Sequence, residues 1–143
     1  MPTLESQDLV ADFIRYYVAP EFVFEEGHIR NTGAAAMNLV GTALPCTLDA
    51  GSGDYDPVAA GAEATATHFC VLRRKEEIAA GGRSQQEYTF LARGPAVCSI
   101  EGLPENDLDD APYDLAALQT ALEAIGVVVR DNRANLRAVT LNN

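Results

Sequence analysis

The sequence predicts a β-rich α+β fold, with a small β-barrel or β-sandwich core, one C-terminal amphipathic helix and an extended N-terminal arm. Short apolar segments separated by Gly, Pro and charged residues recur through the central part of the chain, which is typical of small β-barrels and sandwiches. One later segment has the leucine spacing of an amphipathic helix. Ahead of both, the first 33 residues carry a concentration of aromatic side chains.

Residues 1–33 are predicted to form the N-terminal arm. Pro20 divides two short segments in which aromatic and apolar side chains crowd together, and periodicity leaves open whether the first is a helix or a strand. Exposed aromatic residues ahead of a compact domain favour contact with a partner, and the alternative is that they pack back on their own domain. We predict that the following side chains make up a partner-binding arm: Phe13, Ile14, Tyr16, Tyr17, Phe22 and Phe24.

Residues 34–130 are predicted to form the β-rich domain. The apolar segments indicate strands over residues 38–44, 68–73, 86–93 and 96–100. Turn signals separate them, including Gly81-Gly82 and the tight turn at Gly94-Pro95. Gly41 lies inside the first of these strands, where glycine often marks a bulge or a close backbone approach.

The amphipathic helix is predicted over residues 114–125. Pro112 suits the start of a helix, and Asp114 favours the positive end of the helix dipole. Gly126 fits a left-handed C-terminal cap, and residues 127–129 then indicate a buried strand. Residues 131–143 form an additional C-terminal tail. One side of the predicted helix is an apolar stripe, which consists of Leu115, Leu118, Leu122 and Ile125. This stripe must cover an apolar face, most simply an open end of the barrel.

Composition excludes several classes of partner. The formal net charge of −11 argues against a nucleic-acid surface, because phosphate binding depends on clustered cations. Such acidity suits a protein on the outside of a DNA container, although it also serves solubility alone. No apolar stretch approaches the ~20 residues that a membrane helix needs, and the first residues lack a signal-peptide pattern. We therefore expect no membrane partner, and synthesis in the cytoplasm.

The cysteines and histidines, which often carry catalysis or bind metals, form no recognisable motif in this sequence. Cys46, Cys70 and Cys98 lie far apart in apolar contexts and are predicted to be buried free thiols. His28 and His68 are the only histidines, and no His/Cys pair has the spacing of a zinc site. We predict no catalytic residue, no cofactor, no metal and no enzymatic activity.

Two acidic segments are predicted to be solvated loops. Residues 49–56 contain the Asp, Ser and Gly residues typical of a calcium-binding loop, but Ala60 stands where the closing bidentate Glu is required. Paired carboxylates can also carry out acid–base chemistry, but the second segment has prolines and no nearby histidine. Its acidic residues are Glu101, Glu105, Asp107, Asp109, Asp110 and Asp114.

Two segments of this chain resemble the head decoration proteins of tailed bacteriophages, the lambda-type capsid decoration and stabilisation family. They are "LARGPAVCSI" and "LQTALEAIGVVVR", which are similar to the strand–turn and helix–strand segments of that family. "NLVGTALP" is similar to the family's entry strand, although Pro45 stands where the family has a second glycine. The resemblance covers about residues 37–130 and involves no catalytic group.

The resemblance implies a structural role in a virion. It implies a homotrimer on local three-fold positions outside an expanded capsid, with an N-terminal arm that pairs with the major capsid protein. The protein would be made in the cytoplasm of the host bacterium and located on the capsid exterior. The alternative functions are a free-standing β-rich binding module, or another virion component such as a tail or connector protein.

Overall fold

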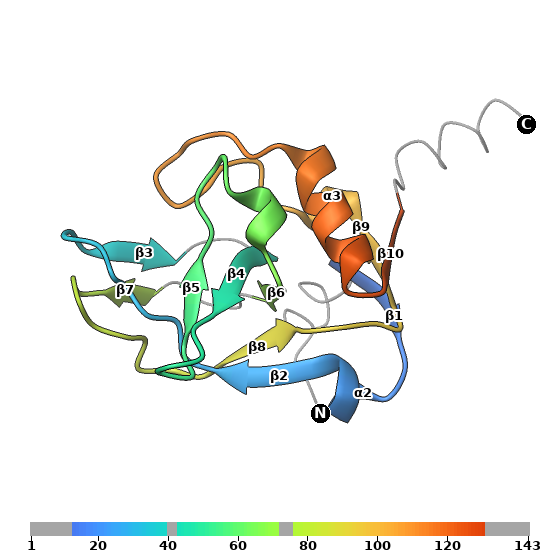
Figure 1. The fold of residues 1–143 in the computed structure, drawn as a ribbon, viewed down its shortest axis with the longest axis horizontal. Helices are drawn as coiled ribbons and strands as arrows, with labels where there is room; N and C mark the ends of the chain where they lie inside the picture. The colour runs from blue at the N-terminus through green and yellow to red at the C-terminus, as the bar shows by residue number, and fades with distance from the viewer. Residues whose placement is uncertain (1–12, 40–42, 72–75, 131–143) are drawn as a thin grey trace, which may run out of the picture.

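The computed structural model describes residues 13–39, 43–71 and 76–130. These residues form a β-rich fold, in which a curled antiparallel sheet resembles half a barrel and the longest helix is α3, Leu115–Ala124 (Figure 1). Two predicted segments, residues 1–12 of the arm and the C-terminal tail at 131–143, lie outside the described residues. The β-rich α+β class predicted from the sequence is thus observed, in the form of a curled half-barrel.

The curled sheet contains five antiparallel strands in the order β2-β8-β6-β4-β5. Their bounds are β2 Phe24–Gly27, β8 Tyr88–Leu91, β6 His68–Val71, β4 Leu44–Leu48 and β5 Tyr55–Pro57. A second sheet has the order β1-β9-β10, with β1 Ile14–Tyr17, β9 Ala96–Ser99 and β10 Val127–Arg130. β3, Met37–Leu39, pairs with β7, Glu76–Ile78.

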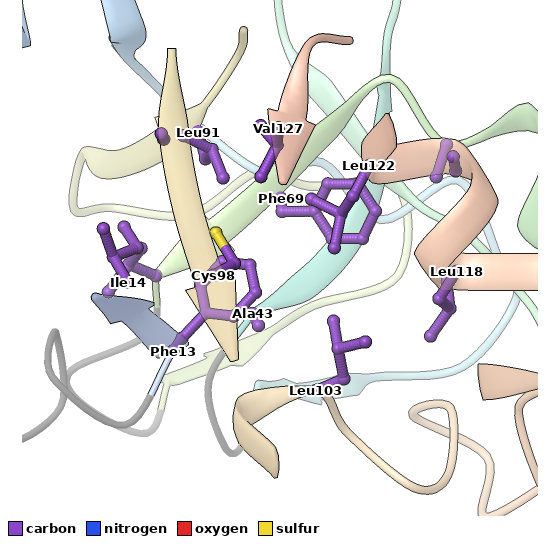
Figure 2. Close-up of a cluster of buried hydrophobic side chains, with 14 of the residues drawn as sticks. Phe13, Ile14, Ala43, Phe69, Leu91, Cys98, Leu103, Leu118, Leu122 and Val127 are labelled. Atoms are coloured by element: carbon purple, nitrogen blue, oxygen red, sulfur yellow. The ribbon is translucent and has the colours of Figure 1, made fainter. Parts of the chain in front are cut away.

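The two faces of the five-stranded sheet are covered by two different apolar clusters. Neighbouring side chains of a strand point to opposite faces, and Phe69 and Cys70 of β6 accordingly belong to different clusters. The cluster that contains Phe69 also includes side chains from α3, β9 and β10 (Figure 2). The other contains Cys70 and is covered by residues such as Ile29 and Ile78. Burial on both faces explains why every residue of β6 is buried.

Helix α3 lies within the segment that the sequence pattern predicts to be helical. The Asp114 carboxylate accepts hydrogen bonds from the N–H groups of Ala116 and Ala117, which have no partner inside the first turn. Gly126 has φ +88°, a left-handed conformation that ends the helix at little cost for glycine. Leu118 and Leu122 are fully buried, while Leu115 and Ile125 are partly buried. The stripe packs beside β10 and the 3-10 turn η1, Glu63–Thr65.

Three strand predictions differ from the structure. The single strand expected over residues 38–44 is divided, since Leu39 ends β3 and Leu44 begins β4 in another sheet. The tight turn expected at Gly94-Pro95 joins strands of different sheets, since it carries the chain from β8 of the five-stranded sheet to β9 of the three-stranded sheet. The strand expected to be buried at 127–129 is the edge strand β10, and Val128 is 52% exposed.

Residues 13–33 also differ from the extended arm predicted from the sequence. β1 pairs with β9 and β2 pairs with β8, so this segment supplies strands to both main sheets. The side chains of Phe13, Ile14 and Val23 are buried in the same cluster as the α3 leucines. Burial of these apolar side chains against the sheets removes more of their surface from water than an extended arm would.

The acidic loop between β9 and α3 contains one buried carboxylate, contrary to the expectation that all of its acids are solvated. The Asp107 carboxylate accepts hydrogen bonds from the N–H groups of Ala60, Asp109 and Ala111, and only 9% of the residue is exposed. Burial acts to raise the pKa of Asp107, but these hydrogen bonds outweigh it and hold the pKa below its usual value. The carboxylate therefore ties this loop to the loop after β5.

Asp107→Asn is expected to lower the free energy of unfolding by about 1–3 kcal/mol, because the amide NH₂ faces backbone N–H donors that it cannot satisfy. A carboxyl group whose pKa is lower in the folded state stabilises the fold above its unfolded pKa, and this stability is lost as the pH falls through the folded pKa. Urea unfolding at neutral pH and below pH ~4 measures both effects. Exposed Asp109→Asn is the matched control, and an equal loss in both variants would contradict the assignment.

Candidate interaction surface

Large hydrophobic side chains lie exposed along β1 and the short helix α2, Pro20–Val23. They are Tyr16 at 60% exposure, Tyr17 at 41%, Val18 at 42% and Phe22 at 56%. We call these four residues the aromatic edge. In the described part of the chain, β1 has a strand neighbour on one side only, because the sheet order is β1-β9-β10. Within the described residues, the aromatic edge therefore combines apolar side chains with an open strand edge.

The outer face of the three-stranded sheet extends this surface. Tyr16 lies opposite Val97 on β9, and Val97 lies opposite Val128 on β10, so the three side chains form one cross-strand row. The side chains of Ala96 and Cys98, which flank Val97 on β9, are buried in the core. Alternation along the strand thus sends one set of apolar residues inward and leaves the row of Tyr16, Val97 and Val128 outward.

Helix α2 places Phe22 at the surface through the burial of its neighbour. Pro20 occupies the start of the helix, where its missing N–H costs nothing, and Ala19 before it has φ +52°. The N–H groups of Phe22 and Val23 both donate to the carbonyl oxygen of Ala19, at 2.8 and 3.1 Å. Val23 is fully buried and anchors the turn, so the adjacent Phe22 side chain projects outward.

Arg93, which follows β8, holds Phe22 in two ways. Its guanidinium lies over the Phe22 ring, 5.0 Å from the ring centroid, in a cation–π contact. The same guanidinium donates a hydrogen bond to the Phe22 carbonyl oxygen and forms an ion pair with the Glu25 carboxylate. Arg93 belongs to the sequence "LARGPAVCSI", but nothing in the sequence indicates that it contacts a residue 71 positions earlier.

A polar network lies behind this contact, on β2, β5 and β6. Glu25 Oε1 accepts a hydrogen bond from the Tyr55 hydroxyl at 3.0 Å and lies 3.2 Å from His68 Nε2. Burial acts to raise the pKa of Glu25, but the hydrogen bonds from Arg93 and Tyr55 and the nearby His68 outweigh it, so the pKa lies below its usual value. Burial and Glu25 raise the pKa of Tyr55 to about 12. Glu25 is therefore ionised at neutral pH and connects Arg93 to the sheet.

The six side chains predicted to bind a partner have different positions in the structure. Tyr16, Tyr17 and Phe22 lie in the aromatic edge and remain accessible. Phe24 is partly buried and makes an edge-to-face contact with Tyr17 at a centroid distance of 5.0 Å. Phe13 and Ile14 are at most 4% exposed, so their side chains belong to the core. In the structure, only three of the six thus present an accessible aromatic side chain.

The other groups considered for catalysis or metal binding have structural roles. Cys46, Cys70 and Cys98 are buried free thiols, as the sequence predicts, and burial raises the pKa of Cys98 to about 12. The Asp49 carboxylate accepts hydrogen bonds from the N–H and hydroxyl of Ser52, which shapes the exposed turn after β4. Among the described residues, no group of three or more His, Cys, Asp or Glu side chains is arranged to hold a metal ion.

A hollow of about 360 Å³ lies away from the aromatic edge, between the loop before β3 and the acidic loop. Two of its charged lining residues have partners within the fold. Arg30 forms ion pairs with Asp56 at 2.6 Å and Asp49 at 3.3 Å, and Asp107 accepts the backbone hydrogen bonds described above. None of the helices in the described ranges has the length and apolar character that crossing a bilayer requires.

Comparison of this chain with protein-family models, curated proteins and solved structures finds no match. The resemblance to the lambda-type decoration proteins therefore stays a prediction that rests on the sequence segments quoted above. The structure does place two of these segments together, because the N–H of Gly94 donates to the carbonyl oxygen of Ile125 at 2.8 Å. The Arg93-Gly94-Pro95 turn and the end of α3 form one packing unit.

Proposed function

We propose that this protein is a capsid decoration protein of a tailed bacteriophage, which binds the exterior of the expanded head as a homotrimer and stabilises it through contacts with the major capsid protein. The observation that carries the proposal is the aromatic edge, since contiguous exposed apolar side chains favour association with another protein. The sequence resemblance names the class of partner, and it rests on segments that pack together in this fold.

The physical basis of such binding is the combination of an open strand edge and aromatic side chains. A strand from the capsid protein that pairs with β1 would gain main-chain hydrogen bonds, and the side chains of Tyr16 and Phe22 would lose contact with water. Three copies in one trimer would bind together, which strengthens attachment without any new contact in a single copy. No nucleophile, metal or proton transfer enters this function.

The test uses single substitutions, because removal of residues 1–30 would also remove β1, β2 and the buried side chains of Phe13, Ile14 and Val23. Tyr16→Ser and Phe22→Ser are each expected to weaken binding to expanded capsids about tenfold or more, as truncation of a buried aromatic anchor does. Leu48→Ser is the matched control, because Leu48 is 44% exposed but lies on β4 beside the 49–54 turn.

Sedimentation with expanded capsids measures how much of each variant is bound. Thermal melting of each free variant shows that it is folded. Cryo-electron microscopy counts the copies of the protein at each binding position on the capsid. Folded Tyr16→Ser and Phe22→Ser variants that occupy capsids as fully as the parent protein would contradict the role of the aromatic edge. Two-fold dimers on the capsid would contradict the trimer. A parent protein that ignores capsids, or binds a tail or connector, would favour the alternative functions.

A further inference from the structure

The carboxylate of Glu25 lies between two groups that can carry positive charge. One of its oxygens, Oε1, lies 3.2 Å from His68 Nε2 and accepts from the Tyr55 hydroxyl. The other, Oε2, is bound by the Arg93 guanidinium. His68 is 9% exposed, whereas the Glu25 side chain is 31% exposed, so water screens their interaction only in part.

The same Arg93 side chain sets the position of Phe22 in the aromatic edge. It binds the Phe22 carbonyl oxygen and covers the Phe22 ring, as described above. His68, Glu25, Arg93 and Phe22 therefore form a continuous series of contacts from the buried strand β6 to the exposed helix α2. Glu25 is the carboxylate that joins His68 to Arg93 in this series.

We propose that protonation of His68 loosens the hold of Arg93 on Phe22, which makes the aromatic edge a pH-sensitive binding surface that is ordered at neutral pH and weakened in mild acid. The proposal goes beyond capsid decoration, because it concerns the order of this surface whatever protein binds it.

The hydrogen bonds define the neutral state of His68. A carboxylate only accepts hydrogen bonds, so Nε2–H donates to Glu25, and in a neutral ring Nδ1 then accepts from the Thr67 hydroxyl at 2.8 Å. Burial holds the pKa of His68 below its usual value, although the charge and hydrogen bond of Glu25 act in the opposite direction. His68 is therefore neutral at pH 7, and Arg93 is the only cation on Glu25 among the described residues.

Protonation places a second positive charge on the same carboxylate. Within the described part of the chain, the charged and titratable groups that face His68 are Glu25 from β2, Tyr55 from β5, Arg93 from the segment after β8, and Cys46 opposite it on β4. Of these, Glu25 supplies the one negative charge near neutral pH, because burial raises the pKa of Cys46 and the pKa of Tyr55 is about 12. His68 and Arg93 then repel each other and share one partner.

The test follows the aromatic rings of the full chain by NMR as the pH is lowered from about 7.5 to about 5, the range in which histidine titrates. We expect the ring signals of Phe22 to shift with the same midpoint as those of His68. His68→Gln keeps an N–H donor for Glu25 but cannot be protonated, so the Phe22 shift is expected to disappear. His28→Gln is the matched control, because His28 contacts Ser84 and Glu87 instead, and the shift is expected to remain.

A Phe22 ring that stays unchanged while His68 titrates, or that shifts equally in His68→Gln, would overturn the proposal. If His68→Gln does not fold, the two midpoints in the parent protein decide, and different midpoints overturn it. The measurement needs no capsid, so its failure is distinguishable from a failure of the proposed function.

Discussion

Gly94→Ala is expected to destabilise the protein by about 3 kcal/mol or more, at or beyond the upper end of the usual cost of overpacking. A Cβ atom at residue 94 would lie 1.9 Å from the carbonyl oxygen of Gly126 and 2.6 Å from its carbonyl carbon. Both are backbone atoms and cannot move like the end of a side chain. Displacement of residue 94 would also break the hydrogen bond from its N–H to Ile125.

Chemical unfolding of Gly94→Ala beside Gly51→Ala tests this expectation. Gly51 has an ordinary φ, and a Cβ atom there would meet only the Asp49 carboxylate at 3.6 Å, so its substitution is expected to be nearly neutral. If both variants unfold at the same denaturant concentration as the parent protein, the close approach of residues 94 and 126 does not exist. The comparison matters because this contact joins the two segments on which the family resemblance depends.

Leu118→Ala and Leu122→Ala are each expected to cost about 2–5 kcal/mol, the usual range for a fully buried leucine whose removal leaves a cavity. Both side chains are fully buried in the cluster that also contains Phe69 and Leu103 (Figure 2). Loss of either side chain removes apolar contacts of α3 within this cluster, which also contains Phe13 and Ile14.

Thermal and urea melting of both variants, with Leu48→Ala as the control, measure this cost. Leu48 is 44% exposed, so its truncation is expected to change the free energy of unfolding by well under half of that amount. Unchanged melting midpoints for both core variants would show that α3 is peripheral. The proposed capsid binding is expected to be retained by both variants at low temperature, because neither leucine is accessible to a partner.

The local features of α3 and β6 could be predicted from the sequence. The leucine spacing, the Asp114 cap and Gly126 act within one or two turns of helix, so residues close in sequence contain all of the information. The segment at residues 68–73 likewise indicates a strand, and its described part, residues 68–71, forms β6. The burial of the three cysteines follows in the same way from their apolar contexts.

The candidate surface was predicted in part. Its location near Tyr16 and Phe22 follows from the aromatic content of the N-terminal segment. Its division into core and surface does not, because the side on which a strand is buried depends on what packs against it. The pairing of β1 with β9 shifts register between Ile14 and Tyr16, so that Ile14 lies opposite Cys98 and Tyr16 opposite Val97. This irregularity sends Ile14 into the core and Tyr16 outward, although residues two apart in a regular strand share one face.

By itself, then, the sequence determined the β-rich class, the capped helix, the buried thiols and the aromatic character of the N-terminal segment, since all of these depend on neighbours along the chain. Only the tertiary structure decided that this segment forms strands of both sheets and that Arg93 contacts Phe22 and Glu25, 71 and 68 residues away. Such pairs follow from the antiparallel pairing of β2 with β8, in which Phe24 lies opposite Leu91, and no local pattern encodes this pairing. Their side chains meet because sheet register brings them together, and the order of residues along the chain does not specify that register.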